Sequence, residues 1–236
     1  MSREIKGIAC DMEGTIFSVE ECHHEGFAAA ARTYGIDITF EDVVNCPGVI
    51  GAGDPGAIAA ILKHYDREDI VIEEFRLRKM VHYDKLLETL PLVLRPGFEQ
   101  FFLQLCQHDF RRGLPLVVAS LTPKAQAKPL IEKSGLGRLV PPERIVLRED
   151  VARVKPAPDV FLKAAELIGV PPENLLVFGD SAKDMLAARA AGALPIGVPY
   201  YWRRNSIAEL MDAGAEHIFR DWRTINFKGL LSAIAG

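Results

Sequence analysis

The sequence predicts an α/β fold, in which a doubly wound parallel sheet (Rossmann-like) carries an inserted all-helical cap domain. Short apolar runs recur along the chain, and segments with helical periodicity separate them. This alternation is typical of βαβ units around a parallel sheet. One long interval, residues 17–95, has helical patterns and no convincing central strand. We therefore expect an α/β core formed by residues 1–16 and 96–236, and a helical cap formed by residues 17–95.

The predicted strands are short apolar runs next to polar residues, glycine or proline, as expected of strands that are buried on both faces. They cover residues 5–10, 114–119, 144–147, 175–178 and 195–198. The helices that alternate with them cover residues 123–134, 156–168, 182–191 and 206–213. Thr122 before Pro123 marks one helix start, because a capping hydroxyl precedes a proline suited to the first turn.

The cap interval contains helical patterns at residues 20–34, 55–64 and 73–90. Asp54 before Pro55 gives the second of these helices a side chain suited to capping. The interval is bounded by the turn after Gly14 and by the segment Arg95-Pro96-Gly97. We therefore expect the cap to be inserted directly after the first strand of the core.

Composition and charge exclude several classes of function. The formal net charge of −4 provides no basic field for nucleic acid and no polybasic patch for membranes. No apolar run approaches the roughly 20 residues that span a bilayer, and the N-terminus lacks the apolar core of a signal peptide. The cysteines, at positions 10, 22, 46 and 106, are too scattered to predict a disulfide framework. We expect a cytoplasmic enzyme, a monomer or a homodimer, that binds neither nucleic acid nor membranes.

The first strand is followed directly by Asp11 and Glu13, in the run Asp-Met-Glu-Gly-Thr. Ligands of open α/β sheets bind beyond the carboxyl ends of the strands. Side chains two residues apart on an extended backbone can project to the same side, and two such carboxylates repel each other unless a cation lies between them. Magnesium is the usual cation beside phosphate. One carboxylate can then attack phosphorus while the other handles the leaving-group proton. A polar turn without chemistry is the alternative.

The second strand end carries Ser120, Leu121 and Thr122. A hydroxyl and neighbouring backbone N–H groups at a helix start can hold a phosphate group. The alternative is purely structural, because Thr122 is also suited to capping the helix that follows.

Lys155 immediately precedes Pro156. Proline favours an extended conformation for the residue before it and can begin the next helix at a fixed place. A lysine held in this way can neutralise charge on a phosphoryl group, although most lysines are solvated surface residues.

The fourth strand end carries Asp180 and Asp184, in the run Gly-Asp-Ser-Ala-Lys-Asp. Asp180 lies where a metal ligand is expected, and Asp184 is four residues further along, within reach of the same helix terminus. A structural alternative exists for Asp184, because Ser181 and Asp184 match a capping box. That alternative leaves Asp180 unexplained.

Together, these four groups resemble the haloacid dehalogenase-like hydrolase superfamily. Its pattern is a nucleophilic Asp, an acid/base carboxylate two residues later, and then Ser/Thr, Lys and an acidic metal motif at successive strand ends. The matching residues, in order, are Asp11, Glu13, Ser120, Lys155, Asp180 and Asp184. The inserted helical cap resembles the subgroup that includes phosphoglycolate phosphatases and β-phosphoglucomutases.

The resemblance implies a chemical role for each acidic residue. Asp11 would attack phosphorus and form an aspartyl-phosphate, while Glu13 would protonate the leaving oxygen and later deprotonate the hydrolytic water. A Mg²⁺ ion would be held by the Asp11 carboxylate, the Glu13 backbone carbonyl and Asp180. Asp184 would support the ion through water or another indirect contact.

By the same resemblance, Ser120, the Leu121 N–H and Lys155 would bind the phosphoryl oxygens. Glu13 departs from the pattern, because the usual acid/base residue is Asp. Glutamate keeps the chemistry, since its ordinary pKa is only about 0.4 higher, but its longer arm must fold back or meet a displaced leaving group. The enolase-phosphatases also carry Asp-x-Glu-Gly-Thr here, although one shared residue does not assign their substrate.

We therefore expect magnesium-dependent hydrolysis of a small phosphorylated metabolite. The nearest alternative is a phosphomutase of the β-phosphoglucomutase type, which uses the same residues but protects the phosphoenzyme from water. A catalytically weak protein that binds phosphate ligands is the alternative of a different class, and Glu13 is the residue that motivates it.

Overall fold

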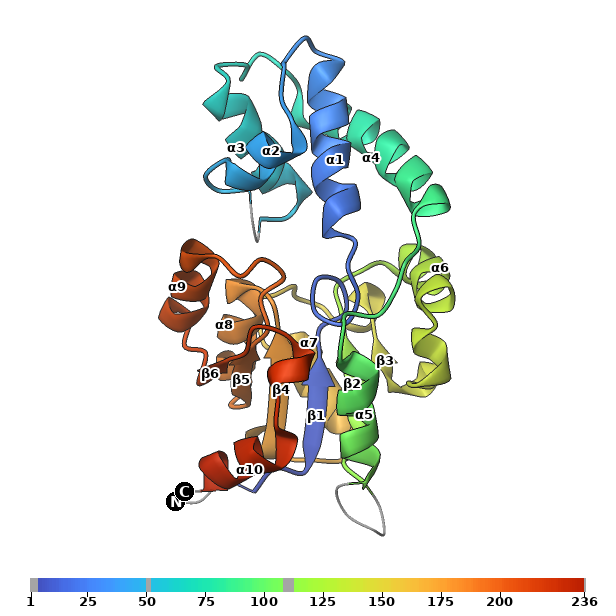
Figure 1. Cartoon of the computed structure of the whole chain (residues 1–236), viewed down its shortest axis with the longest axis vertical. Coiled ribbons are helices and arrows are strands. Elements are labelled where there is room, and N and C mark those ends of the chain that lie inside the picture. The colour runs from blue at the N-terminus through green and yellow to red at the C-terminus, as the bar shows by residue number, and fades with distance from the viewer. Residues whose placement is uncertain (1–3, 50–51, 108–112, 236) are drawn as a thin grey trace. The chain divides into compact units, whose positions relative to one another are not determined.

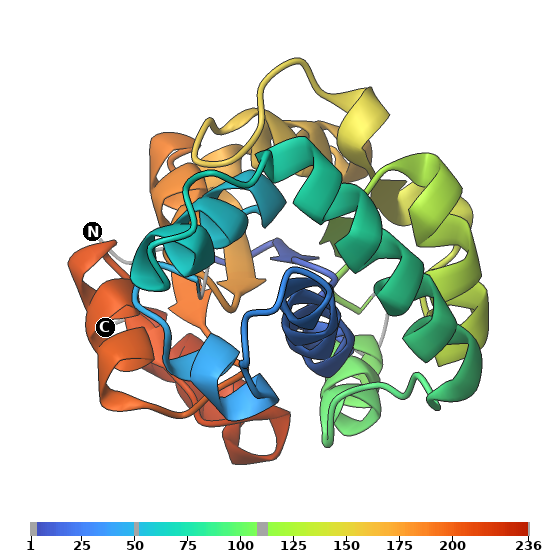
Figure 2. The same ribbon diagram turned by 90° about the horizontal axis from the view of Figure 1, so that it is seen from above.

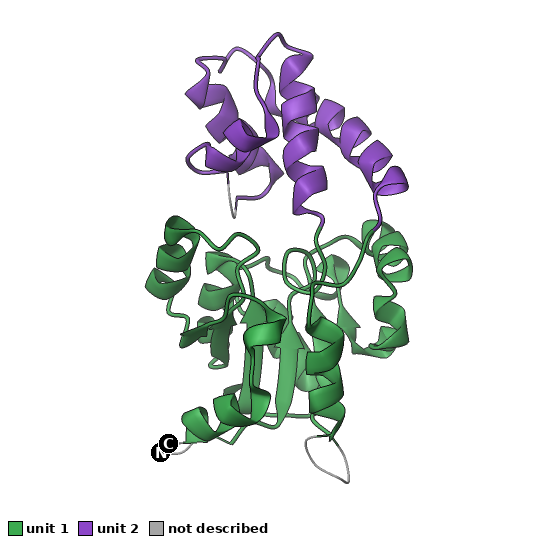
Figure 3. Cartoon of the chain, viewed as in Figure 1, with its two compact units in different colours: residues 1–18, 92–236 green, residues 19–91 purple. Residues whose placement is uncertain are grey.

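The computed structural model describes residues 4–49, 52–107 and 113–235. Its chain divides into two compact units (Figures 1 and 3): a core, Met1–Ser18 with Leu92–Gly236, and a cap, Val19–Pro91. The sequence analysis placed the divisions at 16/17 and 95/96. Both lie further into the interval in the structure, because Phe17 and Leu94 pair with each other in an antiparallel bridge and belong to the core.

The described part of the core contains one sheet with all its strands parallel, which confirms the predicted fold class. The strands are β1 (Gly7–Cys10), β2 (Leu116–Ala119), β3 (Ile145–Val146), β4 (Leu175–Gly179), β5 (Leu194–Gly197) and β6 (His217–Ile218). Their order across the sheet is β3-β2-β1-β4-β5-β6. In the central register, Cys10 lies beside Val118 of β2 and Phe178 of β4. The carboxyl ends of these three strands therefore meet at one edge.

Helices cover both faces of the sheet (Figures 1 and 2). On one face, α5 (Phe98–Gln107) and α10 (Phe227–Ala235) contribute to an aromatic cluster in which the ring centroids of Phe101 and Phe178 lie 5.1 Å apart. On the other face, α7 (Asp159–Ile168) and α8 (Ala182–Ala190) pack in one apolar cluster with Ala9 and Val177. Successive strand residues point to opposite faces, so both faces of β1 and β4 need apolar side chains.

The sequence analysis missed several elements. It did not predict β6, α5, α10 or the short cap helix α2 (Phe40–Asn45). The remaining core helices are α6 (Lys124–Ser134) and α9 (Arg204–Asp212). Short 3-10 turns occur at Leu136–Arg138, Pro142–Arg144, Arg148–Asp150, Pro172–Asn174 and Trp222–Thr224.

One expected helix start and two expected helix caps were wrong. The helix after Lys155 begins at Asp159 rather than Pro156, because a turn intervenes in which the Ala157 N–H donates to the Val154 carbonyl (2.9 Å). Neither expected cap hydrogen bond forms at α6 or α3. The two side chains expected to make them, Thr122 and Asp54, instead bind distant partners.

The cap contains α1 (Glu20–Arg32), α2, α3 (Asp54–His64) and α4 (Ile72–Thr89). Apolar side chains of these helices form one buried cluster, with Phe27, Ile58 and Phe75 among its members. Lys79 is fully buried in the cap, and its Nζ lies 3.0 Å from Asp54 Oδ1 and 2.6 Å from His23 Nδ1. Asp54 thus neutralises a buried lysine instead of capping α3.

Two expectations from composition can be compared with the structure. None of the helices in the described ranges combines the length and apolar character that a membrane crossing requires. All four cysteines of the chain are free thiols, and three of them are buried.

Candidate active site

Asp11 lies at the carboxyl end of β1, in the middle of the sheet. Its N–H donates to the Phe178 carbonyl (2.9 Å), which continues the ladder between β1 and β4 by one residue. The chain then turns back at once, with the Gly14 N–H donating to the Phe17 carbonyl (2.9 Å). Gly14 has a φ of 74°, a left-handed conformation that favours glycine. The Asp11 side chain is therefore held at the end of a rigid strand, just before a tight turn.

Lys155 contacts Asp11 across a sequence separation of 144 residues. Its Nζ lies 2.6 Å from Asp11 Oδ1 and 2.7 Å from Asp184 Oδ1, and it donates to the Ala119 carbonyl at 3.0 Å. Lys155 is 8% exposed, so it is not the solvated surface lysine of the alternative interpretation. The ammonium group is held by two carboxylates and by the end of β2.

Three carboxylates gather at this point. Oxygen atoms of Asp11, Asp180 and Asp184 all lie within 4.8 Å of one another. Thr15 Oγ1 donates to Asp180 Oδ1 (3.0 Å), which fixes that side chain. A Cβ at Gly14 would lie 2.5 Å from Asp180 Oδ2, so the turn must pass close to this carboxylate. Clustered carboxylate oxygens are the donor set of a hard divalent cation, and the group fits Mg²⁺.

Asp184 combines the two interpretations that the sequence left open. Its Oδ2 accepts from the Ser181 N–H (3.1 Å) and hydroxyl (2.6 Å), and a capping box forms at the start of α8. Its Oδ1 faces Lys155. The residue is 2% exposed. One oxygen therefore caps the helix, while the other belongs to the acidic cluster.

The electrostatics of the cluster show an excess of negative charge. Burial raises the pKa of Asp11 from its ordinary 3.8 to about 7, and Asp184 and Glu13 add to this effect while Lys155 opposes it. Burial opposes the charged form of Lys155, yet Asp11 and Asp184 raise its pKa above the ordinary lysine value. A divalent cation beside these carboxylates would relieve the repulsion and favour the ionised form of Asp11.

Glu13 and Ser120 meet through a third side chain. The Thr122 hydroxyl donates to Glu13 Oε1, and Ser120 Oγ lies 2.8 Å from Thr122 Oγ1. Ser120 is 2% exposed, and its N–H donates to the Val146 carbonyl of β3 (3.0 Å). The structure thus brings Glu13 to the end of β2, beside the serine.

Leu121 was predicted to offer its backbone N–H to phosphate. Its side chain is partly buried and packs against the apolar cluster under β1 and β2. The role of its N–H as a phosphate donor stays a prediction.

Sequence reasoning missed three residues at this site. Thr15 appeared only as part of a motif, and Thr122 only as a helix cap. Arg95 was interpreted as a boundary residue, yet its buried guanidinium donates to the carbonyls of Gly14 (2.5 Å) and Val198 (2.8 Å). It thereby ties the turn after β1 to the loop after β5. A buried arginine next to a Pro-Gly pair gives no distinct sequence signal.

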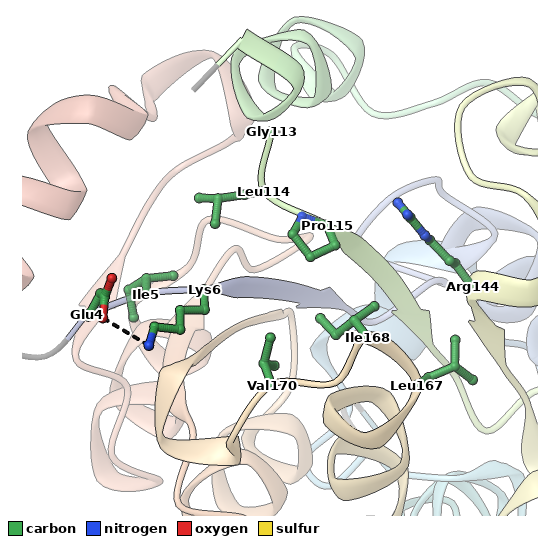
Figure 4. A pocket seen from close by; sticks show the side chains of 10 residues that line it. All are labelled: Glu4, Ile5, Lys6, Gly113, Leu114, Pro115, Arg144, Leu167, Ile168 and Val170. Carbon is green, nitrogen blue, oxygen red and sulfur yellow. Dashed lines mark ion pairs between the residues drawn. The ribbon is translucent and has the colours of Figure 1, made fainter. Parts of the chain in front are cut away.

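A cavity at the opposite end of the sheet is a poor candidate for the same chemistry (Figure 4). Its lining comes from residues that precede β1, β2 and β4, among them Ile5, Pro115 and Val170. Among its lining residues, Glu4 is the acidic one, and it pairs with Lys6 at 3.0 Å. The carboxylate cluster instead lies at the carboxyl ends, where open α/β sheets bind ligands.

Comparisons with known proteins agree with this geometry. The model of the haloacid dehalogenase-like hydrolase family matches residues 5–192. Protein CbbY of Rhodobacter capsulatus is 28% identical over 230 residues, which cover 93% of this chain and 92% of the relative. Phosphoglycolate phosphatase of Shigella boydii is 24% identical over 223 residues, which cover 88% of this chain and 86% of the relative.

Similarity to a solved structure also extends over both units. A crystal structure of mutant CbbY from Rhodobacter sphaeroides, in complex with xylulose-(1,5)bisphosphate, has a TM-score of 0.68 at 24% identity. The match covers 96% of this chain and 99% of that chain. The family model spans most of the chain, including the segments that carry Asp11, Lys155 and Asp180. The resemblance in the sequence is thus confirmed, and this chain belongs to the haloacid dehalogenase-like hydrolase family.

Proposed function

We propose that this protein hydrolyses a small phosphomonoester in a magnesium-dependent reaction that proceeds through an aspartyl-phosphate on Asp11. One observation carries the proposal. The Asp11 carboxylate stands at a central strand end, 2.6 Å from the Lys155 ammonium and in a cluster with Asp180 and Asp184. A nucleophile, a cation and metal ligands therefore lie within reach of one phosphoryl group.

In the first step, a carboxylate oxygen of Asp11 forms a bond to phosphorus, and the bond between phosphorus and the ester oxygen breaks. Glu13 gives its proton to the departing oxygen, which leaves as an alcohol. The Lys155 ammonium offsets the negative charge on the phosphoryl oxygens, and its buried position strengthens that interaction. The product of this step is a phosphorylated Asp11.

In the second step, water attacks the phosphorus of the aspartyl-phosphate. Glu13, now ionised, accepts a proton from this water. The bond between Asp11 and phosphorus breaks, so that inorganic phosphate leaves and the free carboxylate returns. The Ser120 hydroxyl lies at the end of β2 and serves as a donor to a phosphoryl oxygen in both steps.

The acidic cluster would hold the Mg²⁺ ion through Asp11 and Asp180, with the Glu13 backbone carbonyl as a further ligand and Asp184 supporting it indirectly. When bound, the ion supplies positive charge that neutralises the carboxylates and the phosphoryl oxygens. The fit of Asp180 supports this assignment, because Thr15 and the close turn at Gly14 hold that side chain in place.

The substrate class follows from the relatives. One is named a phosphoglycolate phosphatase, and a mutant of another, CbbY, is described in complex with xylulose-(1,5)bisphosphate. Both names refer to small phosphorylated metabolites, which supports the same class of substrate for this chain. The net charge of −4 is consistent with a small ligand rather than a nucleic acid.

The test is phosphate release from phosphoglycolate, xylulose-1,5-bisphosphate, other sugar phosphates, nucleotides and p-nitrophenyl phosphate. Each substrate is assayed with magnesium and again with EDTA, and Asp11→Asn is the control for a contaminating phosphatase. Magnesium-dependent release by the wild-type protein alone would support the proposal.

If none of these substrates released phosphate, the result would contradict hydrolysis. Two further measurements then separate the alternatives. Isomer interconversion with a bisphosphate primer would identify a phosphomutase. Magnesium binding without turnover or interconversion would favour a catalytically weak protein that binds phosphate ligands.

A further inference from the structure

The Thr122 side chain bridges two elements of the candidate site. Its hydroxyl donates to Glu13 Oε1, on the loop after β1, and lies 2.8 Å from Ser120 Oγ, at the end of β2. The Thr122 N–H donates to the same serine oxygen at 3.2 Å. Residues 13 and 122 are 109 positions apart in the chain, so their contact depends on the register of the two strands.

Thr122 has no capping role that would explain its position. Helix α6 begins at Lys124, its N-cap residue is Pro123, and no side chain makes a cap hydrogen bond there. The first N–H of the helix, that of Lys124, donates to the Glu149 carboxylate at 3.0 and 3.1 Å. An acidic side chain from elsewhere in the core thus occupies the place where the Thr122 hydroxyl was expected.

The direction of the hydrogen bonds follows from the chemistry of the partners. Glu13 Oε1 accepts a hydrogen bond when the carboxyl is ionised and also when it carries its proton on Oε2, so the single hydroxyl hydrogen of Thr122 points to it. Ser120 must then donate to Thr122 Oγ1, since the Thr122 hydrogen is already used. When Ser120 turns its hydrogen toward a phosphoryl oxygen, Thr122 keeps its bond to Glu13. The carboxylate can therefore stay in place while the serine binds the substrate.

A glutamate at position 13 needs such a partner more than an aspartate would. Glutamate has one more rotatable bond, and fixing a rotamer-rich side chain of this kind costs conformational entropy. A hydrogen bond to a hydroxyl on a neighbouring strand end selects one orientation. In that orientation Oε1 lies on the side of the sheet edge where Ser120 lies.

We infer that Thr122 is a positioning residue for Glu13, and that its hydroxyl adapts this site to a glutamate as general acid and to alkyl phosphates as substrates. The inference rests on the proposed function. Alkyl alcohols are poor leaving groups that need a proton as they depart, whereas p-nitrophenolate leaves without one. Displacement of Glu13 therefore slows the cleavage of alkyl phosphates selectively.

The experiment compares kcat/KM for an alkyl phosphate and for p-nitrophenyl phosphate at saturating magnesium, because kcat/KM includes the step in which the leaving group departs. Thr122→Val removes the hydroxyl at constant shape. We expect it to lower the alkyl value by about tenfold or more and the aryl value by less than about threefold. Thr122→Ser should restore the alkyl value to within about threefold of wild type, because it restores the donor.

Two controls sharpen the result. Thr89→Val makes the same chemical change on α4, where the Thr89 hydroxyl bonds only to helix carbonyls among the described contacts, and it should alter neither value. In a Glu13→Gln background, Thr122→Val should cause no further selective loss, because the acid it positions is absent. The aryl activity of each variant also reports that the protein is folded.

An equal loss on both substrates, or no loss on either, would overturn the inference while leaving the hydrolase itself intact. Failure of Thr122→Ser to recover alkyl activity would also count against it, since the hydroxyl would then not be the group that matters. Failure of the wild-type protein to hydrolyse either ester is a different result, because it refutes the proposed function.

Discussion

Replacing Asp11 with asparagine removes a buried negative charge at nearly constant volume. The residue Asp11 is 9% exposed, and burial together with neighbouring carboxylates raises the pKa of its carboxyl to about 7 in the absence of metal. An acid whose pKa is higher in the folded chain than in the unfolded chain destabilises the fold, because the unfolded chain ionises first. Asp11→Asn should therefore make the protein more stable in the absence of metal. The same substitution should abolish turnover, because it removes the nucleophile.

The size of the effect follows from the pKa of Asp11. The penalty is absent below about pH 3.8, grows by about 1.4 kcal/mol for each pH unit, and levels off above about pH 7 near 4 kcal/mol. The variant should thus exceed the wild type in unfolding free energy by about 4 kcal/mol at pH 8, but by less than half of that at pH 5. For a chain of this size, 4 kcal/mol corresponds to a rise in Tm of roughly 8–16 °C.

The assay is urea or thermal unfolding of both proteins in EDTA at pH 5 and pH 8, with magnesium added in a parallel series. Magnesium should reduce the difference in unfolding free energy between the two proteins at pH 8, because it stabilises the wild-type protein more than the variant. Turnover of Asp11→Asn should fall by about a thousandfold or more, since the nucleophile is gone. Equal stability of the two proteins at pH 8 would refute the electrostatic reasoning. Retained turnover would refute the covalent mechanism.

Three other substitutions test neighbouring contacts. Lys155→Met leaves buried carboxylates without their ammonium partner, so we expect a loss of about 3 kcal/mol in urea unfolding at pH 8 and at least about a hundredfold in kcat/KM. Gly14→Ala places a Cβ 2.5 Å from Asp180 Oδ2 at a φ of 74°, and calorimetry should show about tenfold weaker magnesium binding. Gly192 has a φ of 80°, and a Cβ added there would meet no atom within 4 Å outside its chain neighbours, so Gly192→Ala is the matched control and should keep the wild-type affinity. Ser181→Ala removes the side-chain cap of α8 and should lower the unfolding free energy by about 1 kcal/mol. Denaturation curves identical to those of the wild type would contradict this prediction.

Much of the core could be predicted from local pattern. Both faces of the central strands are covered, so their residues form continuous apolar runs that stand out in the sequence. The strands of the structure lie within or beside the predicted runs, except β6, whose two residues, His217 and Ile218, include a polar side chain and form no apolar run. Helices α5 and α10 escaped prediction as well, although their apolar faces pack against the aromatic side of the sheet.

Helix caps were the weakest predictions, because several partners compete for a side chain that could cap a helix. Thr122 and Asp54 both precede prolines, yet the structure uses neither as a cap. A hydrogen bond to an ionised or buried partner is stronger than one to a backbone N–H at a helix start, which water or another side chain can satisfy. Asp54 accepts a hydrogen bond from Lys79 in the cap, and Thr122 donates one to Glu13 in the core.

The sequence by itself determined the fold class and the strand ends that carry chemistry, because apolar runs, punctuating glycines and acidic residues are local features. Only the tertiary structure decided which side chains meet. The register that sets Cys10 beside Val118 and Phe178 brings three strand ends together, and Lys155 then reaches Asp11 across 144 residues. Such contacts depend on the angles and spacing of several elements at once, which no short stretch of sequence encodes.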